Sequence, residues 1–252
     1  MQSTSVPPTF SANRAKRLMK ETTPKQKANT GTHSMNKTKL KVKGILFDLD
    51  GTIVDSREAY LEAAKTAFQA IGQKPPTTQT ALEIPKRLEQ NQPIDDITRT
   101  NPQQFLAIYL KTYYAITQEK TKLIPNVSTT LETLSEKAKL ALITMRFVPK
   151  TAITKELEQF NIAKHFTHII TALDTHKPKP SPEALIKSVK ALDVQICDCL
   201  IVGDSVTDIK AGKAAGAKTA AVLSGLFSHE ELAKENPDLI LEDITQLPNH
   251  IE

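Results

Sequence analysis

Short apolar runs alternate with longer amphipathic segments along most of the chain. From Leu40 onward, short runs with strand character are followed by segments whose apolar residues recur every three or four positions. We expect strands at 41–48, 140–145, 168–171, 199–204, 219–223 and 239–241, and helices at 57–72, 126–137, 149–160, 181–191, 206–215 and 228–234. This alternation predicts an α/β fold, a doubly wound (Rossmann-like) parallel sheet with helices on both faces.

One stretch interrupts the alternation. Residues 57–122 contain helical patterns divided by prolines, and residues 73–122 show no strand pattern. The segment 102–118 places Phe105, Tyr109 and Tyr113 at helical spacing, which indicates a buried helix face. We therefore expect three parts: a basic tail at 1–40, a core made of 41–56 and 123–252, and a helical insertion at 57–122.

The net charge of +5 belongs to the tail. Residues 1–34 contain six lysines and arginines and one glutamate, so the rest of the chain is formally neutral. A nucleic-acid-binding domain should carry its positive charge on the folded part, so we expect no specific nucleic-acid partner. The tail is poor in periodic apolar residues, and we expect it to be disordered. An organellar transit peptide and a start at Met35 are alternatives that the sequence leaves open.

Hydropathy and cysteine content favour a cytoplasmic protein. No apolar run approaches the roughly 20 residues that a membrane span needs. Cys197 and Cys199, the only cysteines, lie one residue apart in an apolar run, which is a poor arrangement for a disulfide. We expect both to be buried thiols in a reducing cytosol. The sequence gives no indication of the oligomeric state.

Polar side chains follow several of the expected strands. In sheets of this kind, ligands bind beyond the carboxyl ends of the strands. Asp48 and Asp50 alternate at the end of a buried strand, so both carboxylates can face the same group. Like charges so close cost free energy unless a cation or a chemical task uses them. The candidates for chemistry at this edge are Asp48, Asp50, Thr144, Lys177, Asp204 and Asp208.

These residues occur in an order that resembles a known superfamily. The motifs are "DLDGT" at 48–52, Thr144, "KPKP" at 177–180 and "GDSVTD" at 203–208. Together they resemble the haloacid dehalogenase superfamily, in its subgroup with a small α-helical cap inserted after the first motif. The segment "LIPNVSTTLETL", which follows the insertion, is similar to the return to the core in phosphoglycolate-phosphatase-like members.

The resemblance implies a phosphatase that forms an aspartyl-phosphate. Asp48 would attack phosphorus, and Asp50 would protonate the leaving oxygen and later deprotonate the attacking water. Mg²⁺ would be held by the Asp48 carboxylate, the Asp50 backbone carbonyl and the Asp204 carboxylate. The implied partner is a small phosphorylated substrate, such as phosphoglycolate, a sugar phosphate or pyrophosphate.

The resemblance also implies supporting roles. Lys177 would neutralise charge on Asp48 and the phosphoryl oxygens, and Asp208 would hold Lys177 or a magnesium-bound water. Thr144 would donate a hydrogen bond to a phosphoryl oxygen. Gly51 and Thr52 complete the first motif as candidates for substrate binding.

Position 145 departs from the family pattern. Such phosphatases usually have asparagine there, and this chain has Met145 followed by Arg146. The backbone N–H of Met145 can still reach a phosphate, because every residue except proline supplies one. Arg146 would either contact an anionic substrate or lie exposed on the surface. The departure affects the identity of the substrate more than the chemistry.

By the same resemblance, the insertion would close over the site and exclude water. Its hinges are expected near 55–57 and 122–126. Basic residues of the insertion are candidates for binding a substrate carboxylate or a second phosphate, although such charges usually belong to a solvated helix face. These residues are Lys65, Lys86, Arg87 and Arg99.

Other functions remain open at this level. A phosphomutase related to β-phosphoglucomutase would also need Asp48 and Asp50 but would transfer the phosphoryl group to a sugar. A degenerate, non-enzymatic binding module would normally have lost one of the motif aspartates, all of which are present here. The tail could make weak electrostatic contacts with nucleic acid or acidic lipid.

Overall fold

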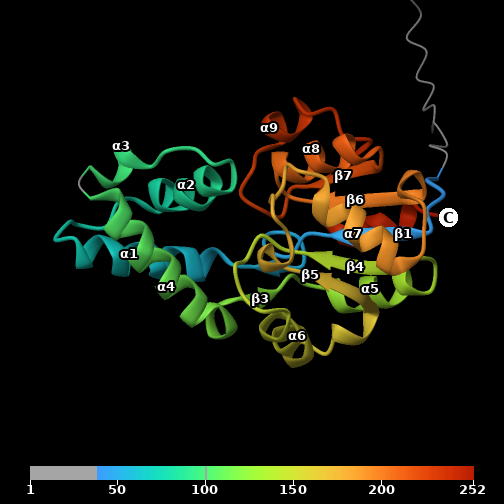
Figure 1. The fold of residues 1–252 in the computed structure, drawn as a ribbon, viewed down its shortest axis with the longest axis horizontal. Helices are drawn as coiled ribbons and strands as arrows, with labels where there is room; N and C mark the ends of the chain where they lie inside the picture. The colour runs from blue at the N-terminus through green and yellow to red at the C-terminus, as the bar shows by residue number, and fades with distance from the viewer. Residues whose placement is uncertain (1–38, 100) are drawn as a thin grey trace, which may run out of the picture. The chain divides into compact units, whose positions relative to one another are not determined.

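The computed structural model describes residues 39–99 and 101–252 (Figure 1). The expected tail therefore lies outside the described residues except for its last two positions. A six-stranded parallel sheet forms the centre of the described chain, in the order β5-β4-β1-β6-β7-β8. Its strands are β1 (Gly44–Phe47), β4 (Lys139–Ile143), β5 (Phe166–Ile170), β6 (Cys199–Gly203), β7 (Lys218–Val222) and β8 (Leu239–Leu241).

Helices cover both faces of the sheet, as the sequence predicts. α7 and α8 pack on one face, and α5, α6 and the 3₁₀ helix η4 pack on the other. The bounds are α5 (Val127–Ser135), α6 (Lys150–Gln159), α7 (Glu183–Leu192), α8 (Val206–Ala215), α9 (His229–Ala233), η1 (Ala163–His165), η2 (Ala172–Asp174), η3 (Ile196–Asp198) and η4 (Ile244–Asn249). The expected α/β doubly wound fold is confirmed.

The central strand shows why the sheet needs two covered faces. Ile45 and Phe47 belong to the apolar cluster under α5 and α6, whereas Leu46 belongs to the cluster under α7 and α8. Side chains alternate between the faces of a strand, so a strand that is apolar at every position must be buried on both sides. β1 lies between β4 and β6, and this order brings Asp48, Thr144 and Asp204 to neighbouring strand ends.

A helical insertion, α1 to α4, follows β1 and has an apolar core of its own. Its helices are α1 (Arg57–Ala70), α2 (Thr78–Glu89), α3 (Asp95–Thr98) and α4 (Pro102–Lys120). Buried alanines line the α1 face toward α4 at positions 59, 63 and 67, and small side chains let two helices pack closely. Asn101 caps α4 by accepting a hydrogen bond from the Gln104 backbone N–H at 3.2 Å.

The two chain segments that enter and leave the insertion pair with each other. β2 (Val54–Asp55) and β3 (Lys122–Leu123) form a two-stranded antiparallel ribbon. The Ile124 backbone N–H extends the pairing by donating to the Ile53 carbonyl at 3.1 Å. The sequence pattern shows neither strand, because two residues are too few for a recognisable alternation.

Two expectations about the rest of the chain have different outcomes. Cys199 is buried in β6, but Cys197 is exposed because it lies in η3, before the strand begins. The expectation that both thiols are buried is therefore wrong for Cys197. Among residues 39–99 and 101–252, no helix combines the length and the apolar character that crossing a membrane requires.

Candidate active site

Asp48 stands at the carboxyl end of β1, next to a buried lysine. Its backbone N–H continues the sheet pattern by donating to the Val202 carbonyl at 2.9 Å. The Lys179 ammonium lies 2.5 Å from Asp48 Oδ1 and 2.6 Å from Asp208 Oδ1. All three side chains are buried. One cation thus joins the strand end of β1 to the first turn of α8.

The structure places Lys179, and not Lys177, beside Asp48. The expectation for Lys177 is corrected: its side chain is exposed, and its backbone N–H donates to Glu183 Oε2 at 3.0 Å. This bond fixes the start of the loop that leads to α7, and Lys179 then follows two residues later with its side chain directed at Asp48. The sequence contains both lysines in one proline-rich run, so spacing alone does not distinguish them.

Asp204 follows β6 and is enclosed by backbone. Its Oδ2 accepts a hydrogen bond from the Leu226 N–H at 3.2 Å. A Cβ atom added at Gly225 would lie 1.7 Å from this oxygen, and one at Gly51 would lie 2.5 Å from it. Only glycine permits such an approach at these two positions. Gly51 thus acts in the site as the close backbone neighbour of Asp204.

The Asp208 carboxylate, at the start of α8, binds both Lys179 and Ser205. Its Oδ1 binds Lys179, while its Oδ2 accepts hydrogen bonds from the backbone and side chain of Ser205 at 3.3 and 2.8 Å. Ser205 in turn accepts from the Asp208 N–H, which completes a capping box. The helix start therefore fixes the carboxylate that holds Lys179.

The buried aspartates provide a set of ligands for a hard cation. One carboxylate oxygen from each of Asp48, Asp204 and Asp208 lies within 4.8 Å of the others. Burial raises the pKa of Asp204, and the neighbouring carboxylates Glu89, Asp48 and Asp208 add to this rise. Burial also raises the pKa of Asp48, where the Lys179 ammonium opposes it. Carboxylates that share one ammonium leave excess negative charge, which a divalent cation would neutralise.

Asp50 is held by several donors at once. Arg146 Nε donates to Asp50 Oδ2 at 2.8 Å, and Arg146 Nη2 donates to Oδ1 at 2.6 Å. Oδ1 also accepts from the Ser56 hydroxyl and from the Tyr113 hydroxyl at 3.1 Å. Burial alone would raise the pKa of Asp50, but the Arg146 guanidinium and these hydrogen bonds bring it below its ordinary value. Asp50 is therefore a carboxylate in this arrangement.

Arg146 differs from both expectations. It is neither exposed nor free to meet a substrate, because its side chain is buried between Asp50 and Glu156, with Nη1 2.6 Å from Glu156 Oε2. Its guanidinium also lies over the Tyr113 ring, 5.7 Å from the centroid. Arg146 thus binds Asp50 itself.

The other sequence candidates have simpler positions. Met145 lines the cavity described below, as does Gly51. The buried Thr144 hydroxyl accepts a hydrogen bond from the Arg146 N–H at 3.1 Å. The buried Thr52 hydroxyl has no partner among the described residues. Neither threonine lines that cavity, in the part of the chain that the structure describes.

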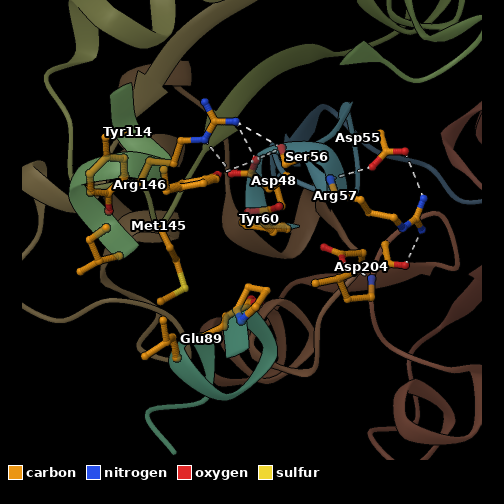
Figure 2. A pocket seen from close by; sticks show the side chains of 18 of the residues that line it. Asp48, Asp55, Ser56, Arg57, Tyr60, Glu89, Tyr114, Met145, Arg146 and Asp204 are labelled. Atoms are coloured by element: carbon orange, nitrogen blue, oxygen red, sulfur yellow. Dashed lines mark hydrogen bonds and ion pairs between the residues drawn. The ribbon is translucent and has the colours of Figure 1, made fainter. Parts of the chain in front are cut away.

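Glu89 is a site residue that the sequence analysis missed. It is the last residue of α2, and its Oε1 accepts a hydrogen bond from the Thr207 hydroxyl of α8 at 2.7 Å. Burial raises the pKa of Glu89, although the nearby Lys179 acts to lower it. Glutamates in helical segments are common, and only the folded structure shows this one lining the same cavity as Asp48 and Asp204. Figure 2 shows Glu89 entering the site from the insertion.

A cavity of about 180 Å³ lies between the aspartates and the insertion. Figure 2 shows Arg146, Tyr114 and Met145 on one side of it and Asp204 and Arg57 on the other. The sequence analysis proposed four basic residues of the insertion as candidates for binding a substrate anion. In the described structure none of them lines the cavity: Lys65, Lys86, Arg87 and Arg99. Lys86 and Arg87 instead form ion pairs with Glu231 and Asp96.

Comparison with known proteins finds a matching family and several relatives. Residues 45–222 match a model of the haloacid dehalogenase-like hydrolases. A phosphoglycolate phosphatase of Pseudomonas fluorescens is 28% identical over 81% of this chain and 77% of its own length. A candidate pyrophosphatase, PpaX, of Caldanaerobacter subterraneus is 30% identical over 82% of this chain and 94% of its own length.

The fold is also shared with solved structures. The crystal structure of a candidate haloacid dehalogenase-like hydrolase from Bacteroides fragilis superposes with a TM-score of 0.72. It is 24% identical and covers 82% of this chain and 100% of its own. At this identity the likeness concerns the fold alone.

Proposed function

Because the chain belongs to the haloacid dehalogenase-like hydrolase family, we propose that it is a magnesium-dependent phosphatase of a small phosphorylated metabolite. The relatives named phosphoglycolate phosphatase and pyrophosphatase support a phosphate ester or anhydride as the substrate. The observation that carries the proposal is the position of Asp48, which lies against Lys179 and within 4.8 Å of two further carboxylates.

In the first step, Asp48 attacks phosphorus. A carboxylate oxygen of Asp48 forms a bond to phosphorus while the bond to the leaving oxygen breaks, and an aspartyl-phosphate results. Lys179 stabilises the charge that develops on the phosphoryl oxygens, because its ammonium is already fixed by Asp48 and Asp208. The leaving oxygen takes a proton from the protonated form of Asp50, which becomes the carboxylate, and departs toward the cavity beneath the insertion.

In the second step, water attacks the aspartyl-phosphate and restores Asp48. Asp50 takes the proton from this water, and the carboxylate form held by Arg146 is the one that can accept it. Inorganic phosphate leaves, and the Asp50 proton is available to the leaving oxygen of the next substrate. Arg146 and Ser56 hold Asp50 in position through both steps.

Asp48, Asp204 and the Asp50 backbone carbonyl would hold Mg²⁺, and Asp208 supplies a further carboxylate nearby. The donor set fits, because Mg²⁺ prefers carboxylate and carbonyl oxygens. When bound, the ion supplies charge neutralisation and orients the phosphoryl group. Among the described residues, the Asp204 carboxylate accepts one hydrogen bond, from the Leu226 N–H, and forms no ion pair, while Gly51 and Gly225 lie against it.

The insertion acts as a cap in this proposal. Several contacts join it to the core around the site: Lys86 Nζ lies 2.8 Å from Glu231, Glu89 accepts from Thr207, and the Tyr113 hydroxyl donates to Asp50. A closed cap excludes water from the aspartyl-phosphate until the leaving group has departed.

Phosphate release from a panel of substrates tests the function. The panel contains phosphoglycolate, pyrophosphate, several sugar phosphates and p-nitrophenyl phosphate, each with and without Mg²⁺. We expect magnesium-dependent release that disappears in Asp48→Asn. Release that persists in Asp48→Asn would contradict the proposed nucleophile.

A further inference from the structure

The cavity wall formed by the insertion is apolar and aromatic. Its side chains come from α1, α2 and α4 and from the loop after β4: Tyr60, Leu88, Tyr109, Leu110, Tyr113 and Met145. Tyr60 and Tyr113 stack with their ring centroids 5.0 Å apart, so this wall is rigid. In the proposed function, the leaving group of the substrate would occupy this side of the cavity.

Among the residues that the structure describes, the cavity lining offers no unpaired positive charge. Its described lining includes five carboxylates and two guanidinium groups, those of Arg57 and Arg146. Arg57 donates to the carbonyls of Ser224 and Gly225 at 2.7 and 2.8 Å and pairs with Asp55. Arg146 is bound by Asp50 and Glu156. A charged leaving group would therefore be buried without a partner, which is strongly unfavourable.

One polar atom of the wall lacks a partner. Tyr109 is 2% exposed, and its hydroxyl is buried with no hydrogen-bond partner among the described residues. Phe105 and Tyr113 stack on either side of its ring, with centroids 5.9 and 6.5 Å away, and this packing fixes its position. Buried hydroxyl groups in native proteins almost always have a partner, and because Tyr109 lines the cavity, an oxygen of a bound ligand could supply one.

We propose that the cavity binds an uncharged leaving group, that of a phosphorylated alcohol, and that Tyr109 is a specificity-determining residue that donates a hydrogen bond to an oxygen of this group. The inference rests on the proposed phosphatase function and narrows its substrate class. Glu89 contributes to the same selection, because a carboxylate at the cavity edge repels a second negative charge on the substrate.

A pair of nearly isosteric substrates tests the charge preference. Phosphoglycolate carries a carboxylate in its leaving group, and 2-phosphoglycolamide carries a neutral amide at the same position. We expect kcat/KM to be at least about tenfold higher for the amide, because the carboxylate finds no cation. A kcat/KM for phosphoglycolate equal to or above that of the amide would overturn the inference and leave the phosphatase function intact. Release from neither compound, nor from p-nitrophenyl phosphate, would overturn both.

Tyr109→Phe tests the hydrogen bond. On 2-phosphoglycolamide we expect kcat/KM to fall about fivefold, and on n-propyl phosphate, which has no oxygen to accept the bond, to change less than about twofold. Glu62→Gln, a change at a half-buried side chain elsewhere in the insertion that does not line the cavity, is the control and should alter neither value. An equal loss on both substrates, or none on the amide, would show that Tyr109 only packs.

Discussion

The guanidinium of Arg146 donates to both carboxylate oxygens of Asp50, from Nε to Oδ2 at 2.8 Å and from Nη2 to Oδ1 at 2.6 Å. Its third nitrogen, Nη1, donates to Glu156. Such bidentate pairs fix the orientation of the carboxylate as well as its charge. Glu156 accepts a further hydrogen bond from the Thr121 hydroxyl at 3.1 Å, directly before β3. Arg146 therefore joins the proposed acid/base residue to the chain that leaves the insertion.

Replacing Arg146 should destabilise the fold, because it leaves two buried carboxylates without their cation. We expect Arg146→Gln to lower the free energy of unfolding by about 3 kcal/mol in urea denaturation. Adding Glu156→Gln to the same chain should restore part of this loss, since one of the two uncompensated charges is then removed. A double variant no more stable than Arg146→Gln would show that Glu156 is not a partner of this arginine.

The two lysines of the proline-rich loop provide a matched pair for catalysis. Lys179→Met should lower kcat by about 10²-fold or more, because the developing charge on phosphate loses its buried ammonium. Lys177→Met, two residues away and exposed, should stay within about twofold of the wild type. Steady-state kinetics on p-nitrophenyl phosphate, with circular dichroism to verify folding, measure both. A larger loss in Lys177→Met would reverse the assignment.

The sequence predicted the aspartates better than their partners. Asp48, Asp50, Asp204 and Asp208 follow β1 and β6, and parallel strands in this order necessarily bring them to one edge. Lys177 and Lys179 could not be distinguished, because both lie in one irregular loop where no periodicity fixes which side chain turns inward.

Other residues could not be predicted for a different reason. Glu89 and Tyr109 belong to helices whose sequence shows only that they are amphipathic. The contact of Glu89 with Thr207 and the place of Tyr109 in the cavity lining both depend on how the insertion packs on the core. The burial of Arg146 likewise depends on Glu156, ten residues away in α6. Such contacts between distant elements leave no local pattern in the sequence.

Removing the Asp204 carboxylate should stabilise the metal-free protein. Burial raises the pKa of Asp204 in the folded state, so the folded chain binds more protons than the unfolded chain above about pH 4. The contribution of Asp204 to stability is therefore fully present at lower pH and is lost as pH rises through its raised pKa. In the metal-free state at pH 7, Asp204→Asn should melt higher than the wild type.

Magnesium should reverse this order. Bound Mg²⁺ stabilises the folded state by mass action, so we expect the wild-type Tm to rise with Mg²⁺ and the Asp204→Asn Tm to change little. Differential scanning calorimetry at pH 5 and pH 7, with EDTA or with Mg²⁺, separates the two effects. Equal magnesium-induced shifts in the two proteins would exclude Asp204 as a ligand.

The two thiols should differ in reactivity. Cys197 is exposed, whereas burial raises the pKa of Cys199 to about 11, and thiolate is the reactive form. Titration of the native protein with a disulfide reagent at pH 8 should release one equivalent rapidly and the second only in denaturant. Cys197→Ser should abolish the rapid phase. Two rapid equivalents in the native protein would show that β6 is more open than described.

The ribbon of β2 and β3 has a consequence for motion of the insertion. Because Val54 pairs with Leu123, the entering and leaving segments are fastened to each other and must bend as one body. The Val54 carbonyl also accepts a hydrogen bond from the Gly51 N–H at 2.7 Å, one residue after Asp50. Any rotation of the insertion against the core would therefore bend the β2–β3 ribbon as a unit and act through Gly51 on the loop that carries Asp50.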